Sequence, residues 1–158
     1  MKIDREQSTK RIKDNINELT RAQYTLVPNA IRRYAYTDVY KNTLDYFANQ
    51  FKELGFEISY DPVGTFIARN RPFGEPVFGI GSHCDSNRNG GPYDGTLGVV
   101  VALEICRLNA EHKTNIPLQV ISFLEEEGSA FAQMLLGSRI MVQRVEESDL
   151  KEHFLSTD

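Results

Sequence analysis

The sequence has few cysteines, no long apolar run and no excess of basic residues, and each shortage excludes a class of protein. Only two of its 158 residues, Cys84 and Cys106, are cysteines, which does not suggest a disulfide framework. No apolar run approaches the roughly 20 residues that a membrane helix needs. The 18 basic residues are outnumbered by 22 acidic ones, for a formal net charge of -4. Without a basic stripe, nucleic acid is a disfavoured partner.

The chain also lacks the signs of export, repetition and low complexity. Its opening stretch, MKIDREQSTKRIKDN, is polar and charged, unlike a secretory signal, so the cytoplasm is the expected compartment. No internal repeat or biased tract is present. The length suits one domain, and a hydrophobic fraction of 41% is enough for one core.

Apolar periodicity predicts alternating helices and strands. Helices are expected at 4–21, from Thr37 or Asp38 to 54, and at 96–110. Strands are expected at 56–60, 65–69, 77–82 and 118–124, the last two as buried strands, followed by a helical tail. The strand–helix–strand order predicts a layered α/β fold. Apolar positions of the third helix include Leu97, Val101, Ile105 and Leu108.

Three polar clusters follow apolar segments, which is where open α/β sheets place their sites. In the first, Asp85 lies two residues after His83, so both can face one side of an extended segment. Asp85 can then accept one ring N–H and leave the other nitrogen for a metal. The second is Asp94, a carboxylate able to bridge two cations at a helix start. In the third, 125–127, one glutamate could bind metal and a neighbour could take a proton from water.

Each cluster alone has an ordinary structural explanation. A His-x-Asp pair is more often a simple hydrogen-bonded pair, and Asp94 could be a turn residue or a helix cap. Acidic triplets are usually solvated. However, a predicted apolar strand directly precedes Glu125, and an acidic run that only lies on the surface would not explain this position. The three clusters in this order are more specific than any one of them.

Longer stretches of sequence resemble a known family. The segment GSHCDSNRNGGPYDGTLGVVVALE, at 81–104, resembles the first metal-binding motif of M20-type metallohydrolases. The similarity is greatest to the branch of N-carbamoyl-L-amino-acid hydrolases, β-ureidopropionases and allantoate amidohydrolases. EEGSAF at 126–131, LGSR at 136–139, and residues 32–37 and 61–64 also resemble that branch.

The resemblance implies a fold and a cofactor. The fold would be part of a zinc-exopeptidase-like catalytic domain, with a mixed sheet flanked by helices. Residues 1–158 would form the N-terminal part of that domain, without the family's inserted dimerisation domain. Two zinc ions are implied, with manganese, cobalt or nickel as alternatives.

The resemblance also implies a role for each site residue. His83 would be a ligand of one metal, Asp94 the bridging carboxylate, and Glu127 a ligand of the second metal. Glu126 would be the general base that activates the attacking water. Asp85 would hold the ring of His83 in place.

The sequence departs from the family in residues and in length. Ala130 stands where arginine is usual and Thr65 where asparagine is usual, while Cys84, expected in the core, stands where an apolar residue is common. Family chains are well over twice as long, and two metal-ligand histidines belong to the part absent here. The remaining histidines, His112 and His153, are expected on the surface. The chain alone should therefore have negligible activity, and an uncovered sheet edge or face should favour self-association.

Three functions remain open from the sequence. The first is an amidohydrolase acting on a small carbamoyl or ureido compound, with neither nucleic acid nor membrane as a partner. The second is a short, non-catalytic relic or partner-binding protein. The third is a deacylase or aminopeptidase of the same group. Metal analysis should separate the first from the second.

Overall fold

A computed structural model describes residues 3–131 and 133–148, and its elements follow the predicted order. The α/β fold class is confirmed. The helices are α1 (Arg5–Glu18), the short 3-10 helix η1 (Ala22–Tyr24), α2 (Asp38–Glu53), α3 (Thr96–Glu111) and α4 (Leu136–Met141). The strands are β1 (Glu57–Tyr60), β2 (Phe66–Arg69), β3 (Phe78–His83) and β4 (Leu118–Phe123).

The four strands form one mixed sheet in the order β1-β2-β4-β3. The β1–β2 and β2–β4 pairs are antiparallel, whereas β3 and β4 are parallel, with His83 opposite Phe123. A parallel pair needs a crossover connection, which here contains α3. Because the two strands run in the same direction, their carboxyl ends reach the same end of the sheet, and the loops that follow them can meet there.

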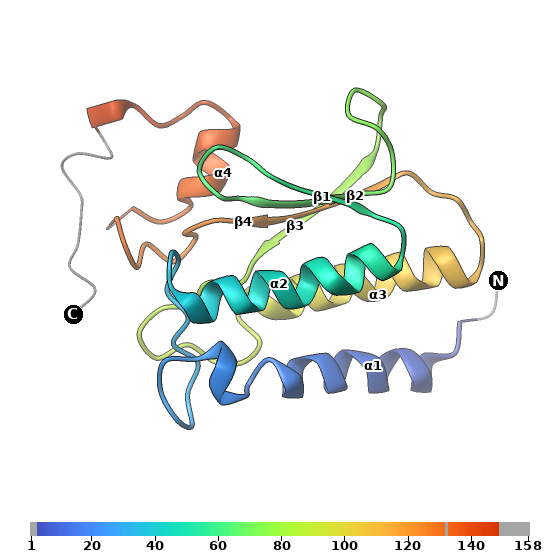
Figure 1. Cartoon of the computed structure of the whole chain (residues 1–158), viewed down its shortest axis with the longest axis horizontal. Helices are drawn as coiled ribbons and strands as arrows, with labels where there is room; N and C mark the ends of the chain where they lie inside the picture. Colours follow the sequence, from blue (N-terminus) through green and yellow to red (C-terminus); the bar gives the residue numbers. More distant parts are fainter. Residues whose placement is uncertain (1–2, 132, 149–158) are drawn as a thin grey trace.

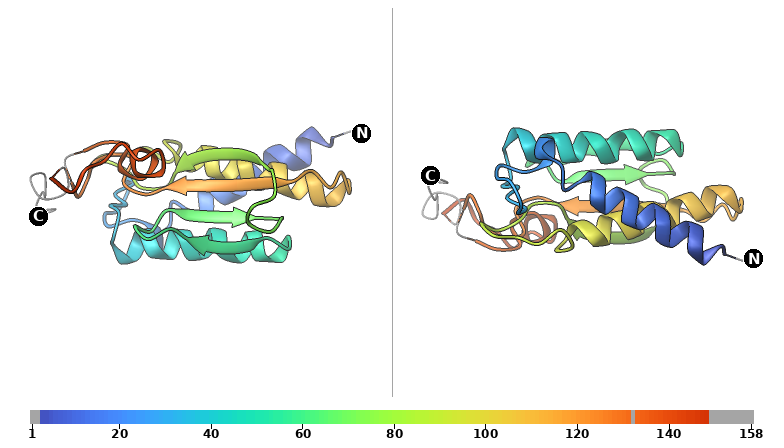
Figure 2. Two further views of the ribbon diagram at one scale, coloured as in Figure 1. Left: turned by 90° about the horizontal axis from the view of Figure 1, so that it is seen from above. Right: turned by 90° about the horizontal axis from the view of Figure 1, so that it is seen from below.

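Three helices cover one face of the sheet. Helices α2 and α3 lie next to the strands, and α1 packs beneath them, with its closest contacts to α3 (Figures 1 and 2). Helix α4 lies at the end of the sheet where β4 finishes (Figure 1). The sheet and α2–α3 therefore form the two main layers, and the loops at one end remain accessible.

Local side-chain chemistry fixes the boundaries of the helix and hairpin before the site. The Thr37 hydroxyl accepts a hydrogen bond from the Tyr40 N–H and caps α2. Gly55, with φ of +79°, takes the left-handed conformation that commonly follows a helix. In the β1–β2 turn, Asp61 Oδ1 accepts from all three N–H groups of 63–65, at 2.8–3.1 Å.

The core lies between the sheet and the α2–α3 layer. The apolar stripe predicted for α2 is buried, with Phe47 and Phe51 fully enclosed. They pack with side chains from both central strands and from α3, namely Phe66, Ala68, Val99, Val100, Leu103, Cys106 and Val120.

One expectation about burial was wrong, and one helix packs in a way that its sequence left open. Strand β3 is not a buried strand but the edge of the sheet, and Phe78 is 68% exposed. The apolar residues Leu97, Val101 and Ile105 of α3 are 37–40% exposed, because the opposite side of the helix faces the core. Segment 97–105 is apolar on nearly every side, so its periodicity does not indicate which side packs inward.

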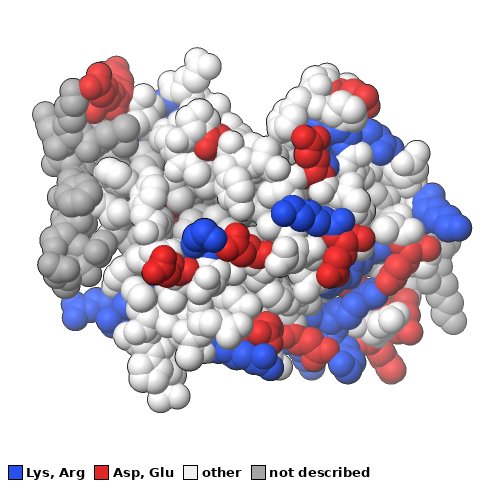
Figure 3. All heavy atoms as spheres, viewed as in Figure 1, with Lys and Arg blue, Asp and Glu red and all other residues white. Residues whose placement is uncertain are grey.

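The described surface mixes charges of both signs. In Figure 3, lysine and arginine side chains alternate with aspartate and glutamate across the face formed by the helices. Within residues 3–131 and 133–148, no helix combines the length and apolar character needed to cross a membrane.

Candidate metal and catalytic site

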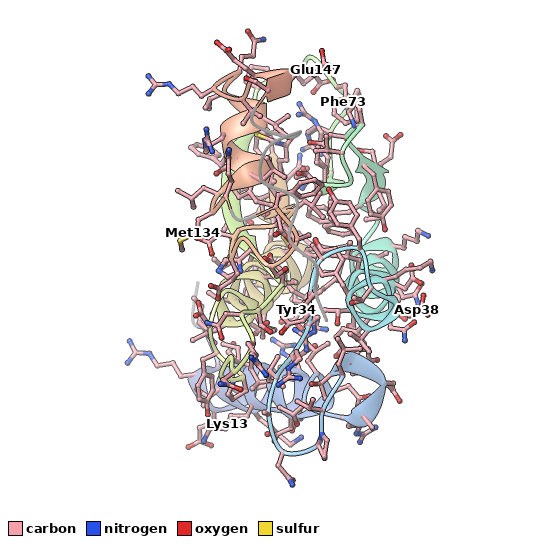
Figure 4. The ribbon with its side chains drawn as sticks, turned by 90° about the vertical axis from the view of Figure 1, so that its left-hand side faces the viewer. Lys13, Tyr34, Asp38, Phe73, Met134 and Glu147 are labelled. Atoms are coloured by element: carbon pink, nitrogen blue, oxygen red, sulfur yellow. The ribbon has the colours of Figure 1, made fainter. Side chains whose placement is uncertain are left out.

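Three chain segments meet where β3 and β4 end. His83 is the last residue of β3, Asp94 lies just before Gly95, the N-cap of α3, and the 125–127 run follows β4. Figure 4 looks onto this end of the molecule, where the loop of Tyr34 and the chain around Met134 surround it. The structure thus brings together three clusters that are separated by up to 44 residues in the sequence.

The imidazole of His83 lies at the centre of the cluster. Its Nδ1 is 3.2 Å from the carbonyl oxygen of Asp85, a hydrogen bond that places the proton on Nδ1. Its Nε2 is 3.6 Å from Asp94 Oδ1 and 3.5 Å from Glu126 Oε2. Nε2 therefore faces two carboxylates, an arrangement that positive charge would stabilise, either a proton on Nε2 or a metal ion between the groups.

Asp85 is fully buried beside the ring of His83. Its Oδ1 lies 3.5 Å from Nδ1 of His83, and its Oδ2 accepts the N–H of Glu127 at 3.0 Å. One carboxylate thus links the segment after β3 to the segment after β4. The role of Asp85 as a support for the ring of His83 stays a prediction.

The three consecutive glutamates have different positions. Glu126 and Glu127 lie in the cluster, and each offers a ligand atom within 4.8 Å of a ring nitrogen of His83. Glu125 is fully buried and turned away: its carboxylate accepts from the N–H groups of Ala130 and Phe131 and from the Ser129 hydroxyl. Glu125 therefore shapes the loop that presents its two neighbours.

The crowding of carboxylates changes the acid–base behaviour of the site. Burial lowers the pKa of His83, but the hydrogen bond and charge of Asp85, together with Glu126, outweigh burial and raise the pKa to about 8. Burial also raises the pKa of Glu127, and the charges of Asp94 and Glu126 add to that effect. The cluster thus has an excess of negative charge that favours a proton or a metal ion.

The donor set fits a metal ion on independent structural grounds. Glu127 Oε1 is buried and has no hydrogen-bond partner among the described residues. A buried carboxylate oxygen without a partner is costly, and a cation would remove that cost. One imidazole with several carboxylates is a ligand set that suits zinc. Asp94 and Glu127 thus each lie near His83, as the sequence predicts, while the compact group of potential ligand atoms is His83, Glu126 and Glu127, and the roles as ligands stay a prediction.

The other cysteine and histidine expectations can also be compared with the structure. Cys84 is buried in the core and free, as expected, and burial raises the pKa of its thiol to about 11. His112 is exposed after α3, as expected. His153 lies outside the described residues.

Sequence reasoning missed two residues that shape the site. Gly95 approaches the imidazole of His83 so closely that a Cβ there would overlap the ring. The sequence signal that could have identified Gly95 is its position directly after Asp94, at the start of the predicted helix at 96–110. Glu125 takes a positive φ of +53°, which is rare for glutamate, and nothing in an acidic triplet distinguishes it from its neighbours.

Known proteins share both the sequence and the fold of this chain. The chain is 33% identical, over 144 residues, to N-carbamoyl-L-amino-acid amidohydrolase of Paenarthrobacter aurescens, a match that covers 89% of the chain and 34% of the relative. It is 32% identical to allantoate amidohydrolase of Bacillus subtilis, with 83% and 33% covered. No protein-family model matches the sequence.

Solved structures show the same arrangement of elements. A hydantoinase/carbamoylase family amidase from Burkholderia ambifaria superposes with a TM-score of 0.80 and 31% identity, covering 89% of this chain and 35% of the other. The chain therefore spans about a third of the length of these relatives.

Proposed function

Because this chain belongs to the hydantoinase/carbamoylase family of amidohydrolases, we propose that it carries metal-binding and proton-transfer residues of a C–N bond hydrolase. The substrate would be an N-carbamoyl amino acid or an allantoate-like ureido compound, as the names of the relatives suggest. Residues 1–158 would form the N-terminal part of the catalytic domain. The two buried cysteines, which are both free, suit a reducing compartment such as the cytoplasm.

One observation carries this proposal: the imidazole of His83 lies 3.5–3.6 Å from the carboxylates of Asp94 and Glu126 at the ends of two parallel strands. His83, Asp94 and Glu127 would hold two zinc ions, with Asp94 shared between them. Bound zinc would polarise the scissile carbonyl and make a water molecule more acidic.

The protein's own groups supply the remaining chemistry. Glu126, which is only partly exposed beside His83, would take the proton of the attacking water and pass it to the leaving nitrogen. Asp85 would hold the ring of His83 so that Nε2 faces the site. Two ions would share one imidazole and a few carboxylates, whereas a zinc ion usually has three or four protein ligands. We therefore expect negligible turnover by this chain alone.

The first test is zinc binding by the chain as it stands. Zinc bound in equilibrium dialysis against low micromolar free zinc is measured for the wild type, for His83→Gln and for His112→Gln, a control at the exposed histidine that follows α3. The proposal expects His83→Gln to lose zinc and His112→Gln to keep it. A wild type that retains no zinc would favour a non-catalytic protein instead.

The second test is turnover by the longest product of the gene. Ammonia release is measured with N-carbamoyl amino acids and with allantoate, in the presence and absence of added zinc. Glu126→Gln should abolish turnover while the bound zinc remains. Full turnover in Glu126→Gln would remove this residue from the base role, and turnover of N-acyl amino acids alone would indicate a deacylase.

A further inference from the structure

A buried arginine outside the polar clusters lies directly behind the site. Arg33 is in the loop between η1 and α2, next to Tyr34 at the end of the molecule shown in Figure 4. It is 1% exposed and is among the largest fully buried side chains. Its N–H donates to the Ser86 hydroxyl, and its carbonyl accepts from the Ser86 N–H, both at 2.9 Å. The loop of Arg33 is therefore paired with the segment that follows β3.

The guanidinium group of Arg33 joins four parts of the chain. Its Nη1 donates to the carbonyl of Cys84 at 3.2 Å and to the hydroxyl of Thr96 at 3.1 Å. Its Nε donates to the carbonyl of Tyr24 at 2.9 Å, and its Nη2 to the carbonyl of Leu19 at 2.7 Å. The last two acceptors belong to η1 and to the end of α1, so the group is anchored on the side away from the site.

The two acceptors of Nη1 belong to the two segments that carry proposed metal ligands. Cys84 directly follows His83, and Thr96 begins α3 two residues after Asp94. A single planar nitrogen thus holds the chain after β3 and the start of α3 at a fixed separation. The guanidinium fork is rigid, so both hydrogen bonds retain their geometry only if the two segments keep their spacing.

We propose that Arg33 is a positioning residue of the metal site, which sets the separation of His83 and Asp94 through its bonds to Cys84 and Thr96. This inference rests on the proposed metal binding. Arg33 acts indirectly, because its hydrogen bonds go to a neighbour of each ligand and not to the ligands themselves. Loss of a hydrogen bond made directly to a metal ligand typically weakens metal binding by roughly ten- to a hundred-fold, so the lower end of that range is expected for Arg33.

The test removes the acceptor and the donor separately. Thr96→Val keeps the shape of a 3% exposed side chain but removes the hydroxyl, and Thr96→Ser keeps the hydroxyl. Arg33→Met removes all the donors. Arg69→Met is the matched control: Arg69 is 7% exposed and bonds the carbonyl of Arg71, but it lies at the opposite end of the sheet.

Two readouts separate positioning from stability. Zinc affinity is measured by competition with a chromophoric chelator, and the absorption spectrum is recorded with Co²⁺ in place of zinc. Both are measured at a temperature at which circular dichroism shows that each variant is folded. Thr96→Val should lower zinc affinity roughly ten-fold and change the Co²⁺ spectrum, and Arg33→Met should do so at least as strongly. Thr96→Ser and Arg69→Met should keep the affinity and spectrum of the wild type.

The outcomes distinguish this inference from the proposed function. If the wild type binds zinc and the valine and methionine variants at Thr96 and Arg33 bind it equally well, the positioning role is refuted and the metal site stands. If Arg69→Met weakens binding as much as they do, the loss reflects general stability, and the role is again refuted. If the wild type binds no zinc, the proposed function fails and the role of Arg33 fails with it. Should Arg33→Met not fold, the comparison of Thr96→Val with Thr96→Ser decides.

Discussion

Replacing Gly95 with alanine should displace His83 without unfolding the protein. Gly95 has φ of +59°, and a Cβ at this position would lie 2.5 Å from Nε2 of His83, with other ring atoms at least as close. Two atoms cannot approach so closely, so either the loop or the ring must move. The ring is the end of a side chain that is 12% exposed, whereas the loop is anchored at the start of α3. The ring should therefore move.

The cost to stability can be separated from the cost to the site. An alanine at positive φ costs about 1–2 kcal/mol through the backbone alone. Gly55→Ala measures that cost by itself, because Gly55 has φ of +79° and no atom within 4 Å of its Cβ position. If the ring of His83 swings away, Gly95→Ala should lose at least about 1–2 kcal/mol, because its ψ of -52° lies outside the left-handed helical region and is less favourable for alanine. The ring would, however, leave its 3.5–3.6 Å positions beside Glu126 and Asp94.

The assay combines urea denaturation of the metal-free protein with zinc competition. We expect Gly95→Ala to stay folded with a loss of unfolding free energy at least as large as that of Gly55→Ala, and only Gly95→Ala to bind zinc at least roughly ten-fold more weakly than the wild type. Wild-type zinc affinity in Gly95→Ala would refute the reasoning, because it would mean that His83 is not a ligand at this position.

Three further predictions concern the loop, the charge and the edge of the site. Glu125→Ala removes the acceptor of two N–H groups at 130–131 and should cost about 2–4 kcal/mol in urea denaturation, whereas Glu125→Gln keeps an acceptor oxygen and should cost about 1 kcal/mol. Folding raises the pKa of His83 from 6.5 to about 8. In the presence of a chelator, the protonated ring should therefore stabilise the fold at pH values below 6.5, and this stabilisation should be lost as the pH rises through 8. We expect about 1 kcal/mol after solvent screening, and a His83→Gln variant without this pH dependence. We also propose that the protein self-associates through the open edge of β3, where Phe78 is 68% exposed. Light scattering should show concentration-dependent dimers, and Phe78→Lys should abolish them. A wild type that stays monomeric would contradict this proposal.

The sequence by itself determined the order of the elements and the identity of the polar clusters. The stripe of α2, its Thr37 cap and the turn at Asp61 could be predicted because each depends on neighbours within a few residues. The clusters could be predicted because each follows a strand or begins a helix. The resemblance to known hydrolases then indicated a role for each side chain.

Only the tertiary structure decided which surfaces are buried and which glutamates reach the site. The pairing order that puts β3 at the edge depends on contacts far apart in the sequence, so an apolar run could not reveal it. Helix α3 is apolar on several sides, and only its packing against the sheet selects one of them. Glu125 turns away from the site because the loop after β4 needs an acceptor for its own N–H groups. Likewise, Arg33 gains its proposed role only because folding places its guanidinium between Cys84 and Thr96, which lie 51 and 63 residues away in the sequence.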